Sequence, residues 1–292
     1  MTLLRSSAVE FTGNIHLVFR YDFPESVLAD EGAYVSMEKG DKIVNIPVSD
    51  GQVTNKGTAF KLPVMIPEFA DDVIVTVCDG SGNKLPVFGA TKGDDYTDGL
   101  IYSVKRYADK KRQHSETPEM EALAEALYDN GTAAQIYFEY GEYQDLAVDS
   151  HVTDESLNAA ISEYALSVEG TKPAGYDSGS IMTYFQSDNT LKITFRLDGS
   201  RPASDFVFKL DGKKVDAETD RDNYYICVKN IPAPLLDKSH EFIISDATSS
   251  YTINASAMSY ANTSVENGSD ARKNLGRAFY LYNQAANAYF NE

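Results

Sequence analysis

Tryptophan is missing from this sequence, cysteine and histidine are scarce, and basic residues are far outnumbered by acidic ones. The 26 lysines and arginines stand against 44 aspartates and glutamates, which gives a net charge of −18 at pH 7. A chain this acidic repels polyanions, so neither nucleic acid nor an anionic membrane surface is expected as a partner. No stretch approaches the roughly 18 consecutive apolar residues of a membrane-spanning helix, so membrane insertion is not expected either.

Because cysteine and histidine are scarce, few side chains of these types are available for catalysis. Cys78 and Cys227 lie in separate strand-like runs without a C-x-x-C motif, and we expect both to be buried free thiols. The four histidines lack metal-site spacing, and the glycine motifs of phosphate binding and of serine hydrolases are missing. Two carboxylates could still form a glycosidase site, but sugar clefts often use tryptophan. We therefore predict no enzymatic activity and no cofactor.

Calcium is the one metal to weigh, because acidic residues gather in two turn-like stretches. Asp94, Asp95 and Asp98 lie in KGDDYTDG, and Asp79 lies in DGSGN. Clustered oxygen atoms on a turn suit Ca²⁺. Neither stretch fits the EF-hand pattern, however, and Asp-Gly pairs are common in turns for backbone reasons alone. We assign no metal site.

The chain is 42% hydrophobic and 11% aromatic, which is enough to build a core. It also contains an internal repeat. Residues 123–138 (LAEALYDNGTAAQIYF) and 275–290 (LGRAFYLYNQAANAYF) are identical at seven of sixteen positions. The strand-like runs Asn14–Tyr21 (NIHLVFRY) and Thr190–Leu197 (TLKITFRL) alternate in the same register. A repeat of half the length argues for two domains, which we place at residues 1–146 and 147–292.

Each copy is predicted to end in two helices. The long helices open at Thr117–Glu119 and Asn267–Asp270, where capping residues precede the apolar stripe. For the shorter helices we match Tyr102–Val104 with Tyr251–Ile253, which leaves one extra helical turn in the second copy. A further short helix is expected within Asp154–Ala165. The prediction is an α+β fold of two tandem repeats, each an antiparallel sheet or sandwich covered on one face by its own antiparallel helical hairpin.

The stretches VLADEGAYVSM, VCDGSGNKLP, LIYSVKRYAD, NGTAAQIYFEY and YLYNQAANAYF carry a resemblance. They resemble a recurrent tandem module of large secreted or cell-surface proteins of gut Firmicutes, among them Ruminococcus, other Lachnospiraceae and Clostridia. The resemblance covers essentially the whole chain. It implies an extracellular location, a place within a larger multidomain protein and a non-enzymatic role. Because Met1–Phe11 lacks the apolar core of a signal peptide, the export signal is expected outside this sequence.

We predict an extracellular binding or adhesion module that recognises a host or neighbouring-cell protein, for example a mucosal glycoprotein or an immunoglobulin. Tyrosine offers rigid contact area with a polar tip. Four tyrosines lie in stretches that read as loops, and they are the predicted binding residues: Tyr96, Tyr143, Tyr176 and Tyr184. The alternatives are a carbohydrate-binding module, which the lack of tryptophan disfavours, and a structural spacer. Function is expected where the copies differ, in Gly93–Gly99 and Gly141–Gly175.

Overall fold

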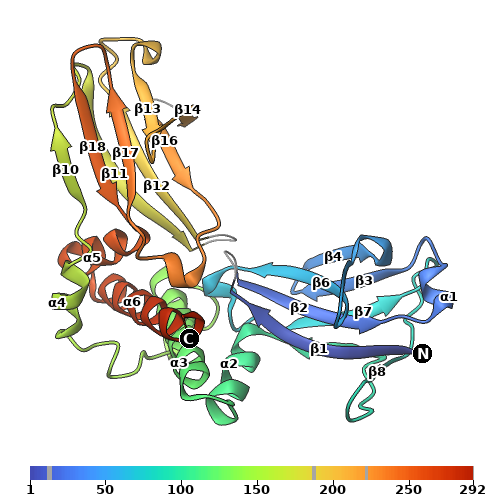
Figure 1. The fold of residues 1–292 in the computed structure, drawn as a ribbon. Helices are drawn as coiled ribbons and strands as arrows, with labels where there is room; N and C mark the ends of the chain where they lie inside the picture. Colours follow the sequence, from blue (N-terminus) through green and yellow to red (C-terminus); the bar gives the residue numbers. More distant parts are fainter. Residues whose placement is uncertain (12–14, 186–188, 221–222, 292) are drawn as a thin grey trace.

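The computed structural model describes residues 1–11, 15–185, 189–220 and 223–291. Two β-rich parts extend from a group of helices that lies where they meet (Figure 1). The described chain has 18 strands in four sheets, and every strand pair is antiparallel except β1 with β8. The predicted α+β class with antiparallel sheets is therefore confirmed.

The first β-rich part encloses a core between two sheets. Leu17 and Phe19 from one sheet and Val35 and Val75 from the other belong to one buried cluster. The predicted strand at residues 14–21 is confirmed, although Asn14 lies outside the described residues. One sheet has the order β5 (Gln52–Thr54), β6 (Gly57–Val64), β2 (Ile15–Asp22), β1 (Thr2–Glu10), β8 (Val87–Gly89), and the other has the order β4 (Lys42–Pro47), β3 (Tyr34–Lys39), β7 (Val73–Cys78), β9 (Leu100–Tyr102).

The second β-rich part also has two sheets, and eight of its strands follow the same pairing order. The Asp211-Gly212 hairpin predicted between two strands is present, with both residues at positive φ. One sheet has the order β11 (Tyr176–Phe185), β12 (Asn189–Leu197), β16 (Asn223–Val228), β15 (Glu218–Asp220), and the other has the order β10 (Ser167–Gly170), β18 (Ser250–Ala255), β17 (His240–Ser245), β13 (Val207–Leu210), β14 (Lys213–Val215).

The two β-rich parts agree in detail at their first hairpin. The β1–β2 register shifts between Leu4 and Ser6, and the β11–β12 register shifts between Tyr176 and Ser178. The bulged residue carries a charge in both cases, Arg5 paired with Asp22 and Asp177 with Arg196. The two β-rich parts differ in one added strand each. β8 joins the sheet that contains β1, whereas β10 joins the sheet that faces β11.

The helices do not pack as predicted. We expected each hairpin to cover a face of its own sheet, but the two long helices pack chiefly against each other, and the hairpins meet the ends of the sandwiches. Leu123 and Leu275, at repeated positions, are both fully buried in a core that continues through both halves. The helices are α1 (Glu25–Leu28), α2 (Val104–Gln113), α3 (Pro118–Phe138), α4 (Leu157–Ser162), α5 (Ala257–Asn267) and α6 (Asp270–Phe290).

The Tyr-Phe pairs that end α3 and α6 reach the opposite half. Phe290 lies with its ring centroid 6.3 Å from that of Phe11, which follows β1. Burial, with Tyr289 of α6 alongside, raises the pKa of Tyr107 in α2 to about 12. At the other end, burial and the neighbouring Tyr137 of α3 raise the pKa of Tyr260 in α5. These repeated residues therefore make contacts between the halves.

The predicted extra helical turn in the second copy is also wrong. Ser103 precedes α2 and caps it by accepting the Arg106 N–H, while Ser256 precedes α5 and forms a capping box with Ser259. The Tyr-Ala pairs occupy the same positions in both helices when counted from these serines. The four additional residues belong to strand β18, which is longer than β9.

Candidate functional site

The four predicted tyrosines do not meet in one place. Tyr96 lies between β8 and β9, where its hydroxyl donates to Asp94 at 3.3 Å, and Tyr143 begins a short 3₁₀ turn after α3. Both are half-buried. Tyr176 and Tyr184 were predicted to lie in loops, and this is wrong, because both belong to strand β11. The side chain of Tyr184 lies outside the described part of the structure.

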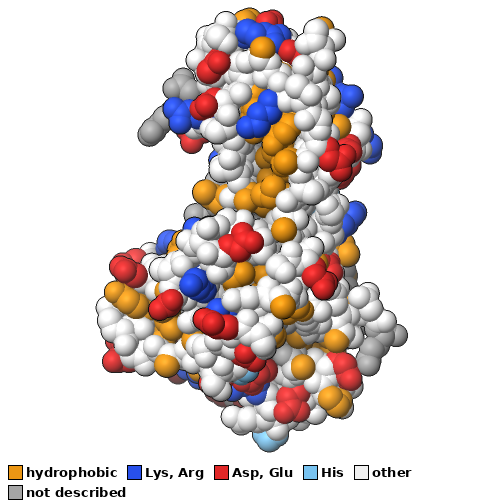
Figure 2. Space-filling model, turned by 90° about the vertical axis from the view of Figure 1, so that its left-hand side faces the viewer, with side chains coloured by type: hydrophobic (Ala, Val, Ile, Leu, Met, Phe, Trp, Pro, Cys, Tyr) orange, Lys and Arg blue, Asp and Glu red, His pale blue; other side chains and the backbone are white. Residues whose placement is uncertain are grey.

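Tyr176 lines an apolar groove on the open side of the second sandwich. The groove has a volume of about 490 Å³ and runs between the edge strands β10 and β11, with β18 at its base. Figure 2 shows hydrophobic side chains gathered in a stripe on this side of the upper, β-rich part. The lining residues are Leu166, Val168, Lys172, Tyr176, Ser178, Gly179, Ser180, Ile181, Ile193, Tyr251, Ile253 and Thr263.

The local sequence of β11 explains why the groove is open. Ser178, Gly179 and Ser180 present little side chain toward it. A Cβ atom on Gly179 would lie only 2.5 Å from the Tyr176 hydroxyl oxygen, so the tyrosine needs glycine there to lie across the strand. The Tyr176 ring lies 5.5 Å from that of Tyr251. Burial raises the pKa of Tyr176 to about 12, which keeps its hydroxyl neutral.

One cation lies at the end of the groove where β11 begins. The Lys172 ammonium lies 5.2 Å from the Tyr176 ring centroid and 5.6 Å from that of Tyr251, within the range of cation–π attraction. Among the described lining residues it is the only charged side chain, although the chain as a whole carries −18. Among the lining residues that the structure describes there is no Asp, Glu, His or Cys that could serve as a general base or nucleophile.

The corresponding side of the first sandwich is filled by the chain itself. Strand β8 pairs in parallel with β1, and its residue Val87 is 3% exposed. The Tyr102 hydroxyl reaches the Ser7 carbonyl at 3.5 Å, and its ring packs edge-on against Phe19. The segment that supplies β8 runs from β7 to β9. Its counterpart between β17 and β18 is a short turn, so the second half has no equivalent filling strand in this connection.

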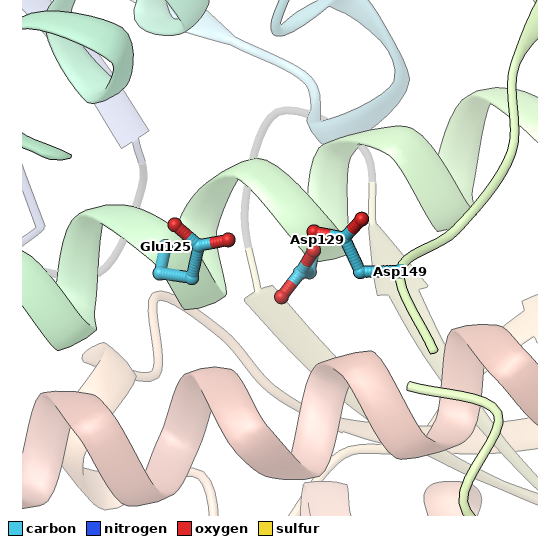
Figure 3. A group of neighbouring side chains, drawn as sticks. All are labelled: Glu125, Asp129 and Asp149. Carbon is cyan, nitrogen blue, oxygen red and sulfur yellow. The ribbon is translucent and has the colours of Figure 1, made fainter. Parts of the chain in front are cut away.

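A carboxylate cluster is the second notable group, and the sequence reasoning missed it. Glu125 and Asp129 of α3 converge with Asp149, with one ligand oxygen of each within 4.8 Å of the others (Figure 3). Burial raises the pKa of Asp129, and its Oδ2 lies 2.7 Å from His151 Nε2. Arg112 holds Glu125 through two hydrogen bonds. The i, i+4 spacing on α3 was a visible signal, but Asp149 arrives from the connecting segment.

The acidic turns weighed for calcium use their carboxylates locally. Asp79 accepts the Ser81 and Asn83 N–H groups, each at 2.9 Å, and Asp95 accepts the Thr97 N–H at 2.9 Å. These are turn-closing contacts that the backbone favours without any ion. The two cysteines are free, as predicted, but Cys227 is only half-buried.

A more polar hollow of about 410 Å³ lies near the bulge of the second sandwich. Asp177, Arg196 and Arg201 supply charge there, and Tyr224 supplies an aromatic wall. Arg201 is itself held by Asp246, at 2.6 Å from Nη1 to Oδ2. Hydrogen-bonding groups beside one ring can contact a sugar.

Comparison with models of protein families and with curated proteins finds no match to this chain. Among the described residues, no helix is both long and apolar enough to span a membrane. The function is therefore inferred from the geometry of the surface.

Proposed function

We propose that this chain is a non-catalytic extracellular binding module of a gut bacterial surface protein, and that it recognises a host or neighbouring-cell protein. The observation that carries the proposal is the apolar groove between β10 and β11, with Tyr176 in its wall. Leu166 and Val168 at its rim are 39% and 49% exposed, which leaves apolar area available to a partner. Contiguous exposed apolar surface of this kind marks interaction sites.

The extracellular location and the larger parent protein belong to the same proposal. They are supported by the resemblance of stretches such as YNQAANAYF to modules of secreted Firmicutes proteins. A mucosal glycoprotein or an immunoglobulin is the partner class that fits such a location. The acidic surface keeps the module from binding polyanions indiscriminately.

We further propose that the two halves are tandem copies of one β-plus-helical-hairpin module, with the boundary near residue 146. The matching strand orders, the matching bulges and the equal 21-residue lengths of α3 and α6 support it. In this proposal the copies have diverged in use. The first has filled its open side, and the second has kept it available.

Affinity capture from intestinal secretions tests the binding proposal. The immobilised full chain is expected to retain one dominant protein, identified by mass spectrometry. Val168→Glu places a charge at the groove and should abolish retention, whereas Val53→Glu, on the 83% exposed edge position of β5, should leave it unchanged. Uniformly weak retention by all three proteins would contradict the proposal and favour a spacer.

Carbohydrate binding is the second candidate, and the polar hollow at Arg196 and Tyr224 favours it. Carboxylate and guanidinium groups beside a tyrosine ring are a combination that can bind a sugar. A glycan array probed with the full chain tests it. Hits that disappear in Tyr224→Ala but persist in Val168→Glu would establish this candidate, and an array without hits would remove it.

A further inference from the structure

The groove of the second sandwich lies between two strands whose outer edges are free. Within the described chain, β11 pairs on one side only, with β12, and β10 pairs on one side only, with β18. We propose that the groove binds an extended, apolar segment of the partner protein, which adds to the free edge of β11 as a further β-strand. This inference rests on the proposed binding function and specifies the chemistry of the partner.

The edge of β11 is unusually open to such pairing. It is a ten-residue strand, and its groove-lining stretch 178–181 reads SGSI. Natural sheets protect their edges with proline, with lysine or other inward charges, or with a very short strand. Residues 178–182 (SGSIM) contain neither proline nor charge, although a bulge precedes them at Asp177. Helix α5 reaches the strand only at Thr183, whose hydroxyl donates to the Ala257 carbonyl at 3.4 Å. Unpaired main-chain groups beside an apolar groove are the features that strand-addition sites use, the first for affinity and the second for specificity.

The first half shows that an uncharged segment of the chain itself can add at this edge. There β8 adds in parallel to β1, the strand in the position of β11, through pairs from Thr2 with Val87 to Leu4 with Gly89. The β8 stretch LPVFGA, residues 85–90, is uncharged, and Val87 inserts until it is 3% exposed. β8 lies before the β1 bulge at Arg5, whereas the groove-lining residues 178–181 follow the equivalent bulge at Asp177. A partner segment of this chemistry would therefore lie farther along the edge than β8 does.

The charge of Lys172 favours an acidic residue at one end of the partner segment. A strand parallel to β11 has its N-terminal end where β11 begins, and there the Lys172 ammonium lies over the rings of Tyr176 and Tyr251. No carboxylate is among the described lining residues, so this ammonium is available to an acidic group of the partner. We therefore expect the preferred segment to carry Asp or Glu directly before its apolar run.

Two labelled peptides test the inference on the full chain. Both carry the residue 85–91 sequence LPVFGAT, one preceded by Asp and the other by Lys, and binding is measured by fluorescence anisotropy. The Asp peptide should bind in the micromolar-to-millimolar range and about threefold more tightly than the Lys peptide, a factor typical of one exposed ion pair. Val168→Glu should weaken it by at least about tenfold, because the new charge would lie against the apolar segment.

Two controls make the result decisive. Val53→Glu should bind the Asp peptide like the wild type, and thermal melts should show that both variants are folded. No saturable binding by the wild type, or equal binding by Val168→Glu, would overturn strand addition. If the peptide test fails but Val168→Glu still abolishes capture from secretions, the proposed function is retained and the ligand is not an added β-strand. Loss of both signals would reject the function itself.

Discussion

The two sandwiches share a strand order but differ on one side. In the first, the long connection between β7 and β9 returns as β8 and buries Val87 against β1. In the second, the connection between β17 and β18 is a tight turn closed by Asp246, and the added strand β10 leaves Val168 half-exposed beside a groove. The difference teaches that one connection can decide whether the side of a sandwich is buried core or open surface.

The largest expected effect is a difference in the free energy of unfolding between variants of Val87 and variants of Val168. Val87→Asp would place a carboxylate in an apolar interior, so it should lower the free energy of unfolding by about 3–4 kcal/mol. Val168→Asp should change it by no more than about 0.5 kcal/mol, because solvent already reaches that position. Urea denaturation of the two variants measures both. Similar losses at the two sites would show that β8 is not core, and the comparison would fail.

A second comparison concerns the crossing of the long helices. Leu123 in α3 and Leu275 in α6 occupy repeated positions and are both fully buried. Truncation of either to alanine should cost about 3 kcal/mol, the usual loss for a buried leucine that leaves a cavity. Leu28→Ala, at a 58% exposed position, is the matched control and should have little effect.

Because the core continues through both halves, the two leucine variants should lower the midpoint of the same cooperative transition. Differential scanning calorimetry distinguishes the outcomes. Two transitions, each shifted by only one of the variants, would mean that the halves unfold independently.

A smaller effect is expected where the equivalent strands β7 and β17 end. Asp79 and Asp246 both accept turn N–H groups, but Asp246 also faces Arg201. The Arg201 guanidinium lowers the pKa of Asp246 well below its usual 3.8, and the Asn83 amide lowers that of Asp79. A carboxyl group with a lowered pKa stabilises the fold above its unfolded pKa and loses that contribution as the pH falls below about 3.8.

Asp246→Asn should therefore destabilise the protein more than Asp79→Asn at pH 7. The destabilisation by each variant should shrink as the pH falls below 3.8, where the carboxyl groups of the unfolded chain take up protons. The gap between the variants should close only as the pH falls through the lowered pKa values of the folded protein. Chemical denaturation in buffers from pH 7 to pH 3 measures it. Equal destabilisation by the two variants at pH 7 would contradict the role of the Arg201 pair.

Periodicity in the sequence predicted the strands with clear alternation and the two long helices with capped, striped patterns. It missed β1 and β11, because runs such as RSSA and SGS do not alternate in hydrophobicity. An apolar stripe shows that a helix is buried but does not identify its neighbour, so the contact of α3 with α6 was not foreseen. Tyr176 was named as a binding residue from its expected exposure, whereas its groove arises from four strands and a helix that the sequence could not place together.

The most direct test of the contrast between the two open sides is hydrogen–deuterium exchange of the full chain with and without the Asp-LPVFGAT peptide. The account predicts slower exchange in residues 176–181 of β11 when the peptide is bound, and no change in residues 2–4 of β1, which are already paired with β8. Protection in β1, or peptide binding that leaves β11 unprotected, would contradict it.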